Sequence, residues 1–296
     1  MSQEILQPVQ TLSDALRLGR KRLASSRTET PGLDAEVLLR HVLGIDRTQL
    51  FVRLSELVDQ ATITTYTQLI EERARGVPVA YLIGAREFMS LAFAVGPGVL
   101  VPRPETEILV EWAIAWLHQR GGGPVMVVDV GTGSGAIAIS IAKGMGPTWF
   151  GRVLAADISP HAVSVATRNR DRLQVEDRVH VVHGSLLSWL RSPVDLVLAN
   201  LPYLRQEQIA ENPSLSAEPS LALDGGVDGL DLICQLLADA PRVVRAGGAL
   251  GLEIDPAQRD DVVLLARHAF PDSQVNVLTD LAGLDRHVTV QTEAKR

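Results

Sequence analysis

Short apolar runs alternate with helical patterns from residue 125 onward, and this alternation limits the possible folds more than any other feature of the chain. Runs typical of buried strands lie at residues 125–130, 152–156, 179–183 and 196–199. Such a pattern predicts a doubly wound α/β domain with a mainly parallel sheet. In these sheets ligands bind beyond the carboxyl ends of the strands, so the residues that follow each run are the first candidates for a site.

A glycine-rich loop, Gly131-Thr-Gly-Ser-Gly135, follows the first run. Glycines there let backbone amides approach a ligand closely, and the N-terminus of the next helix favours an electronegative group. Asp157 ends the second run, at the spacing expected of a carboxylate that binds ribose hydroxyls. Two alternatives stay open: the glycine spacing also fits dehydrogenases, and Asp157 could simply cap the helix that starts at Pro160.

The fourth run leads directly into Asn200-Leu-Pro-Tyr203, which combines a polar side chain, a rigid proline and an aromatic ring. An ordinary turn after a strand is the structural alternative, since Asn and Pro are common turn residues. Dehydrogenases have no need of this tetrapeptide at that strand end, whereas enzymes that methylate planar nitrogens do. The combination therefore favours a methyltransferase.

The N-terminal part, residues 1–85, has a different pattern and predicts a small helical unit. Thr11 and Asp14 resemble a capping box, and further helices are expected at 34–43 and 62–75, each followed by a glycine. No catalytic constellation occurs there, so packing or partner recognition is its expected role.

A hairpin is expected between the two parts, with β-like pieces at 80–83 and 91–95 separated by turn residues. Pro104 then suits the first turn of a helix expected over 108–117. The dipole of that helix favours acidic residues such as Glu105 and Glu107 at its start, which explains these residues without any function.

Charge and composition exclude several function classes. The net charge is −7, and residues 1–85 hold ten basic and ten acidic side chains, so the acidic excess lies in the remainder. A basic excess, usual in proteins that grip nucleic acid, is missing, and Arg168, Arg170 and Arg172 are interpreted as a solvated helix face. No apolar run or leader indicates a membrane protein or a secreted one, which predicts a cytoplasmic location.

Cysteine and histidine usage gives no sign of a metal site. The single cysteine, Cys234, lies in an apolar helical pattern and is expected to be a small core residue. The seven histidines show no ligand spacing. We therefore predict neither a disulfide framework nor a bound metal.

Together, the loop with its preceding strand (128–135), Asp157 and Asn200–Tyr203 resemble the class I S-adenosylmethionine-dependent methyltransferases. Further segments resemble, more narrowly, the release factor glutamine methyltransferases, the PrmC/HemK family. These segments are residues 33–36, 76–81, 86–88, 102–107, 218–230 and 285–286. The most specific are Pro-Arg-Pro-Glu-Thr-Glu at 102–107 and Leu-Asp-Gly-Gly-Val-Asp-Gly within 218–230.

The resemblance implies a Rossmann-like, seven-stranded methyltransferase domain behind a small all-helical domain and a β-hairpin linker. The expected boundaries are 1–85 for the helical substrate-recognition domain, 86–103 for the linker and 104–296 for the methyltransferase domain. It also implies S-adenosyl-L-methionine as the cofactor and the glutamine of the Gly-Gly-Gln tripeptide in class 1 peptide chain release factors as the substrate. We expect a monomer that does not bind nucleic acid directly.

Site residues follow from the same resemblance. The cofactor is expected to contact Gly131, Thr132, Gly133, Ser134, Gly135, Asp157, Leu186 and Asn200. Asn200, Pro202 and Tyr203 are the expected catalytic residues, and Leu201 joins them in binding the substrate. The Asn200 side-chain oxygen and the Leu201 carbonyl are expected to accept the amide hydrogens of the glutamine. Leu186 stands where the family often has an aromatic residue beside the adenine.

Leu201 departs from the usual Asn-Pro-Pro-Tyr of the family. Asn-Leu-Pro-Tyr is similar to the motif of ribosomal RNA adenine dimethyltransferases, so an RNA or DNA adenine methyltransferase is the second hypothesis. The absent basic excess and the N-terminal helical part speak against it. A third hypothesis, a protein that binds release factors without turnover, is opposed by the intact glycine loop, Asp157 and Asn200.

Overall fold

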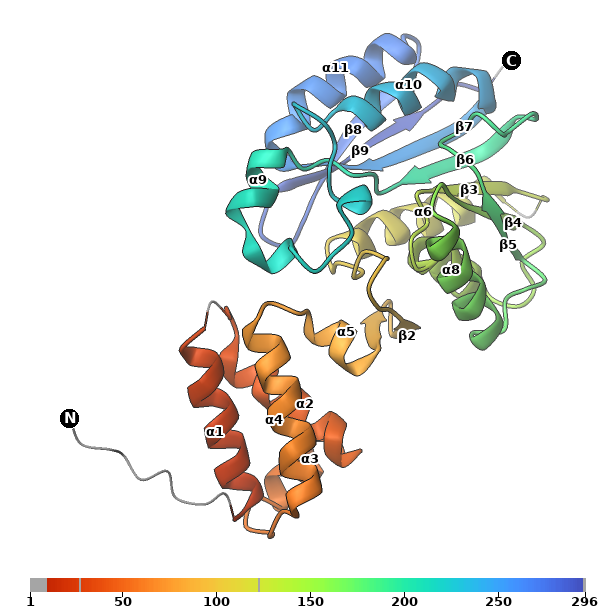
Figure 1. The fold of residues 1–296 in the computed structure, drawn as a ribbon. Helices are drawn as coiled ribbons and strands as arrows, with labels where there is room; N and C mark the ends of the chain where they lie inside the picture. The colour runs from red at the N-terminus through yellow and green to blue at the C-terminus, as the bar shows by residue number, and fades with distance from the viewer. Residues whose placement is uncertain (1–9, 27, 122, 295–296) are drawn as a thin grey trace. The chain divides into compact units, whose positions relative to one another are not determined.

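The computed structural model describes residues 10–26, 28–121 and 123–294, and the chain divides into two compact units (Figure 1). Unit 1 contains Met1–Gly84 and the short segment Pro213–Ala217, and unit 2 contains Ala85–Asn212 and Glu218–Arg296. Each unit has its own hydrophobic core.

Unit 1 is helical around a small apolar core. Its helices are α1 (Leu12–Ala24), α2 (Pro31–Leu43), α3 (Arg47–Val52), α4 (Gln60–Ala74) and α5 (Val79–Ile83). The predicted capping box at the start of α1 is confirmed: Thr11 Oγ1 accepts from the Asp14 amide, and the Asp14 carboxylate accepts from the Thr11 amide, both at 3.2 Å. Fully buried Tyr66 on α4 fastens the helices, since its hydroxyl donates to the Ala35 carbonyl on α2.

Residues 80–83, predicted as a β-like piece, lie instead in helix α5, so that prediction was wrong. An apolar run of four residues has no period that separates helix from strand. Its flanks decide the matter, because Pro78 precedes the helix and Gly84 ends it in the left-handed conformation at φ 71°. The hairpin forms just beyond, from β1 (Ala85–Phe88) and β2 (Leu91–Ala94).

The hairpin belongs to unit 2 and is tied to it by a buried side chain. Asn169, on helix α8 (Pro160–Arg172), accepts from the Ala94 amide at 2.8 Å and donates to the Ala94 carbonyl at 2.9 Å. The same amide group donates to the carbonyl of Ser134 at 2.8 Å. One asparagine thus links the hairpin, α8 and the glycine loop.

Unit 2 is built on a seven-stranded sheet with the order β5-β4-β3-β6-β7-β9-β8. Strand β9 pairs antiparallel with both β7 and β8, and the pairs from β5 to β7 are parallel. The strands are β3 (Met126–Val130), β4 (Arg152–Asp157), β5 (Val179–His183), β6 (Val194–Ala199), β7 (Val244–Glu253), β8 (Gln274–Thr279) and β9 (Asp285–Gln291). Every residue of β6 is buried, including Asp195, and the burial of its apolar run 196–199 agrees with the prediction. The predicted α/β class is confirmed.

Helices cover both faces of this sheet (Figure 1). The helices of unit 2 are α6 (Thr106–Arg120), α7 (Ala136–Gly144), α8, α9 (Gln206–Glu211), α10 (Asp231–Val243) and α11 (Arg259–Ala269). Helices α10 and α11 share one apolar cluster with side chains of the sheet, and α6, α7 and α8 pack on the other face. Helix α6 is longer than expected, and Pro104 lies in the turn before it rather than in its first turn.

Two further expectations concern single side chains. Cys234 is exposed on α10, not buried, so its assignment to the core was wrong. The helix buries Ile233, Leu236 and Leu237, which places Cys234 just outside the apolar stripe. On α8, Arg168 and Arg172 are exposed as expected, although Arg172 also donates to the Ala92 carbonyl of the hairpin.

Candidate active site

A cavity of about 300 Å³ lies in unit 2 where the carboxyl ends of β3, β4, β5 and β6 meet. The cavity is lined by residues at or after the end of each strand. These are Gly131 and Gly133 after β3, Asp157 at the end of β4, Leu186 after β5 and Asn200 after β6. Strand order reverses between β3 and β6, and such a switch point is where open α/β sheets bind ligands. Residues outside these strand ends, among them Gly98, His161 and Leu221, complete the wall.

The glycine loop after β3 is held from behind by a buried carboxylate. Asp129 Oδ2 accepts from the Thr132 hydroxyl at 2.5 Å and from the Ala138 amide at 3.2 Å. Burial raises the pKa of Asp129 to about 7, and these two hydrogen bonds oppose the rise. Gly133 has φ +56°, and a Cβ there would meet no atom within 4 Å, so the loop leaves open space at this point.

Asp157, at the end of β4, ties this loop to the start of α8. Its Oδ2 accepts from the Gly133 amide and its Oδ1 from the Ser159 amide, both at 2.9 Å. Ser159 caps α8 by accepting from the Ala162 amide at 3.3 Å, so the capping role considered for Asp157 falls to Ser159. Each Asp157 oxygen keeps acceptor capacity for a further donor at the cavity wall.

Asn200 follows β6, and its side chain is connected through Thr106 to Glu253 on the neighbouring strand β7. Its Nδ2 donates to the Thr106 hydroxyl at 3.0 Å, and that hydroxyl donates to Glu253 Oε2 at 2.6 Å. Glu253 ends β7, which pairs with β6 in parallel register, so the two strand ends are neighbours.

The other Glu253 oxygen, Oε1, accepts from the Tyr203 hydroxyl at 3.3 Å. Burial, with the nearby Glu253 charge, raises the pKa of Tyr203 well above its usual range, so the phenol stays protonated at neutral pH. Both ends of Asn200–Tyr203 therefore connect to one buried carboxylate.

The segment 218–230 packs directly on this tetrapeptide. A Cβ at Gly225 would lie 2.7 Å from the Pro202 carbonyl oxygen and 2.8 Å from Tyr203 Cα. The Gly225 amide donates to the Leu204 carbonyl at 2.8 Å. Glu218 anchors the start of the segment by accepting from the Val101 amide at 3.0 Å and from Arg103 at 2.5 Å. Gly225 and Gly229 are required because the backbone of residues 202–203 passes against them.

The structure brings most of the predicted site residues to one cavity wall. Those that line it are Gly131, Gly133, Asp157, Leu186, Asn200, Leu201 and Pro202. Thr132, Ser134, Gly135 and Tyr203 lie outside the wall. Gly135 is needed for packing, because a Cβ there would come within 2.9 Å of Ile139 and 3.4 Å of Ala166. The contacts of all these residues with cofactor or substrate stay predictions.

Sequence reasoning missed Thr106 and Glu253. Glu253 ends an apolar run on β7 just as Asn200 follows the run of β6, and this repeated pattern could have revealed it. Thr106 had no such signal, because its position in Pro-Arg-Pro-Glu-Thr-Glu is also explained by an ordinary helix start. The cavity residues Gly98 and His161 belong to no recognisable motif.

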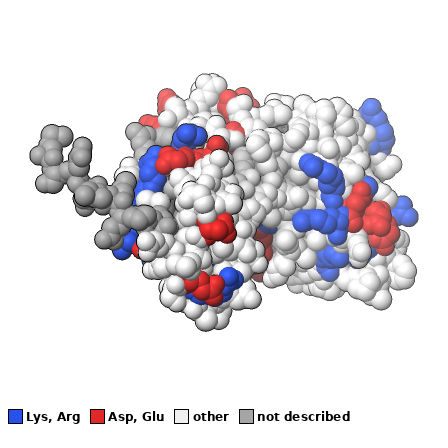
Figure 2. All heavy atoms as spheres, turned by 60° about the horizontal axis from the view of Figure 1, so that its bottom comes forward, with Lys and Arg blue, Asp and Glu red and all other residues white. Residues whose placement is uncertain are grey.

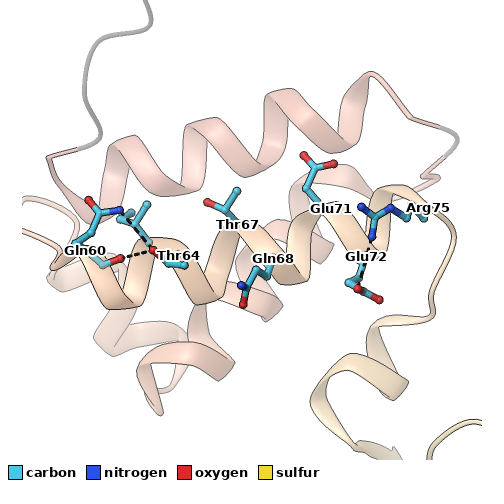
Figure 3. Close-up of a pocket in the computed structure, with 8 residues that line it drawn as sticks. Gln60, Thr64, Thr67, Gln68, Glu71, Glu72 and Arg75 are labelled. Atoms are coloured by element: carbon cyan, nitrogen blue, oxygen red, sulfur yellow. Dashed lines mark hydrogen bonds and ion pairs between the residues drawn. The ribbon is translucent and has the colours of Figure 1, made fainter.

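Unit 1 has a more open hollow of about 450 Å³ along α4, with polar side chains (Figure 3). Figure 3 shows Gln60, Thr67 and Glu71 along this helix. Glu71 is paired with Arg22 at 2.8 Å, and the lining contains neither histidine nor cysteine. The hollow is therefore a poor candidate for catalysis.

Other kinds of site find no support in the part of the chain that the structure describes. No group of three or more His, Cys, Asp or Glu side chains there could hold a metal ion. Among the described helices, none has the length and apolar character of a membrane span. On the face drawn in Figure 2, basic and acidic side chains lie beside one another and form no continuous basic track over the described residues.

Comparisons with known proteins find methyltransferase family models in both units. Residues 14–84 match the family model of the PrmC N-terminal domain, and residues 109–204 match that of the ribosomal protein L11 methyltransferase (PrmA). Among solved structures, the hMettl16 catalytic domain in complex with an RNA hairpin shares the fold, with a TM-score of 0.56 at 12% identity over 80% of this chain and 84% of that chain.

Relatives of known function are similar over nearly the whole length. The release factor glutamine methyltransferase of Moorella thermoacetica is 42% identical over 278 residues, which cover 93% of this chain and 96% of the relative. That of Rhodopirellula baltica is 36% identical over 89% of this chain and 90% of the relative. These similarities do not favour the nucleic acid methyltransferase hypothesis. With identity at this level across both units, the chain belongs to the release factor glutamine methyltransferase family.

Proposed function

We propose that this protein transfers a methyl group from S-adenosyl-L-methionine to the side-chain amide nitrogen of the glutamine in the Gly-Gly-Gln tripeptide of class 1 release factors. The observation that carries the proposal is the position of Asn200. Its amide lies at the wall of the same cavity as the glycine loop and Asp157, and it is held there by Thr106. A nucleotide cradle and a group able to orient a planar amide thus share one site.

The cavity residues fit this cofactor. Asp157 can accept ribose hydroxyls with its remaining lone pairs, the open space at Gly133 admits a ligand close to the backbone, and Leu186 offers an apolar wall to the adenine. The cavity volume lies at the lower end of the range usual for small-molecule sites. When bound, S-adenosylmethionine supplies an electrophilic methyl group on a positively charged sulfur.

The substrate amide is a poor nucleophile because its nitrogen lone pair is delocalised into the carbonyl. Asn200 Oδ1 and the Leu201 carbonyl can each accept one hydrogen of this amide, which orients the nitrogen and favours the positive charge that develops on it. Pro202 limits backbone motion beside the Leu201 carbonyl through its fixed φ. Once the N–C bond has formed, one hydrogen of the alkylated nitrogen is acidic enough to leave to solvent, so no strong general base is required.

Unit 1 is proposed to recognise the release factor as a folded protein, because it carries polar surface but no catalytic constellation. A shortened chain beginning at Ala85 keeps the whole of unit 2, hairpin included, together with residues 213–217, which belong to unit 1. It should bind the cofactor but methylate intact release factor more slowly than the full chain. Equal rates would contradict the recognition role. The protein is further proposed to act as a cytoplasmic monomer without direct contact to nucleic acid.

Mass spectrometry of purified release factor tests the proposed reaction. After incubation with the full chain and S-adenosylmethionine, the tripeptide glutamine should gain the mass of one methyl group. Transfer to ribosomal RNA and not to the release factor would favour the nucleic acid hypothesis instead. Cofactor binding and release factor binding without any transfer would favour a binding protein.

A further inference from the structure

We propose that Thr106 and Glu253 are positioning residues that determine which way the Asn200 amide faces, so that its oxygen is presented to the substrate. The inference rests on the proposed function, since it concerns the group that orients the substrate amide. Neither residue needs to touch substrate or cofactor, and neither is among the residues that line the cavity.

The direction of the hydrogen bonds follows from the chemistry of their acceptors. The Thr106 hydroxyl donates to the carboxylate oxygen Oε2 of Glu253, at 2.6 Å. The lone pairs of Thr106 Oγ1 are then left for Asn200, which can satisfy them only with its NH₂ group, at 3.0 Å. The amide is thereby turned so that Oδ1 points away from Thr106.

Burial makes this orientation strict. Thr106 is 4% exposed and Glu253 is 2% exposed, so water does not compete at either position. Asn200 Oδ1 accepts no hydrogen bond from the described residues 10–26, 28–121 and 123–294, whereas Nδ2 has Thr106. A reversed amide would place two acceptors, Oδ1 and Thr106 Oγ1, against each other in a buried place, which is unfavourable.

The same carboxylate also sets the Tyr203 hydroxyl, through Oε1 at 3.3 Å. One further ionisable group faces it: His287, its register partner on β9, has Nε2 3.6 Å from Oε2 and is fully buried. That separation is too long for a good hydrogen bond. Thr106 is therefore the hydrogen-bond donor to Oε2. Glu253 supports Asn200 through Thr106 and supports Tyr203 directly.

Matched variants of the full-length protein separate this positioning role from simple packing. Thr106→Val keeps the shape of the side chain but removes the hydroxyl, whereas Thr106→Ser keeps the hydroxyl. Thr289→Val is the control, because Thr289 is a fully buried threonine of the same unit that lies on β9, outside the site. Glu253→Gln is a second test, since its amide can present NH₂ to Thr106 and let that hydroxyl donate to Asn200 Oδ1 instead.

Methylation of release factor and the side-chain amide signal of Asn200 in ¹H–¹⁵N spectra are measured for each variant, and calorimetry reports cofactor binding. Thr106→Val should lower kcat about 10- to 100-fold, as losses of groups that orient a site residue commonly do, with the Kd of the cofactor within about 2-fold. The bonded Asn200 amide is expected to exchange its hydrogens slowly in the wild type, and faster in Thr106→Val. Thr106→Ser and Thr289→Val should retain both activity and exchange protection, and Glu253→Gln should resemble Thr106→Val.

Equal loss of kcat in Thr106→Ser and Thr106→Val would overturn the inference, because packing alone would then explain the site. Unchanged kcat and unchanged amide exchange in Thr106→Val would also overturn the inference. If Thr106→Val does not fold, Glu253→Gln is the deciding variant, and a wild-type kcat in it would overturn the inference. A wild-type protein without activity on release factors would refute the proposed function instead. In that case the exchange of the Asn200 amide in the same variants still decides whether Thr106 sets its orientation.

Discussion

Replacing Asp157 by alanine should weaken the binding of S-adenosylmethionine about 10- to 100-fold. Each carboxylate oxygen already accepts one backbone amide, from Gly133 or Ser159, and can accept one ribose hydroxyl besides. A hydrogen bond to a charged group contributes about 1.5–3 kcal/mol, and two would give about 3–6 kcal/mol. Because Asp157 is half-buried, water can replace part of these hydrogen bonds after the change. We therefore expect the binding free energy to fall by about 1.4–2.8 kcal/mol, which corresponds to the 10- to 100-fold increase in Kd.

Asp157→Asn makes the prediction more specific. An amide retains one acceptor oxygen, but its NH₂ group must then face the N–H of either Gly133 or Ser159, two donors that already point at the carboxylate. The isosteric asparagine should therefore bind the cofactor no better than alanine. Calorimetric titration at constant pH and salt measures both, with Asp177→Ala, an exposed aspartate of the same unit, as the control. A folded Asp157→Ala protein with wild-type Kd, or wild-type binding by Asp157→Asn, would refute the reasoning.

Three further predictions concern the same unit. Asn200→Ala should lower kcat about 10²- to 10³-fold, while Leu201→Pro should stay within about tenfold of wild type in methylation assays, because that position acts through its carbonyl; comparable losses would mean that the loop acts by shape alone. Burial raises the pKa of Asp129 from 3.8 to about 7, so its contribution to the free energy of unfolding is complete below about pH 4 and is lost as the pH rises through 7. Urea unfolding should therefore show wild type losing up to about 3 kcal/mol relative to Asp129→Asn between pH 5 and pH 8, and parallel curves would contradict this. Gly225→Ala should destabilise the protein by about 1–3 kcal/mol, because its Cβ overlaps the Pro202 carbonyl, and Gly123→Ala, whose Cβ meets nothing, should be near neutral.

The parts of the fold that sequence could predict are those whose signal is local. The apolar run 196–199 of β6 is typical of a strand that is buried on both faces, and in a parallel sheet the residue after it lies at the carboxyl edge. The same reasoning placed Asp157 and Gly131 at neighbouring strand ends, and parallel register then brings them to one cavity.

The errors arose where the deciding contact lies elsewhere in the chain or where the period is ambiguous. Residues 80–83 form a helix because Pro78 and Gly84 mark its ends, although their composition suits a strand. Cys234 is exposed because its helix turns the neighbouring Ile233 inward, and a shift of one position is below what an apolar pattern resolves. The link from Thr106 to Glu253 spans 147 positions, and no spacing rule could have indicated it.

Polar side chains at the ends of these strands hold the scaffold of the site in place. Asp129 holds the loop through Thr132, Asp157 holds it through Gly133, and Glu253 holds Asn200 through Thr106. Removing Asp157 would therefore change both a proposed ligand contact and the geometry of the residue it supports, whereas removing Asp129 or Glu253 changes that geometry alone. For this reason isosteric replacements, which keep the volume and alter only donor or acceptor character, separate the two effects in this site better than alanine does. The order of hydrogen-bond donors and acceptors behind the cavity is thus as much a part of the site as the residues that line it.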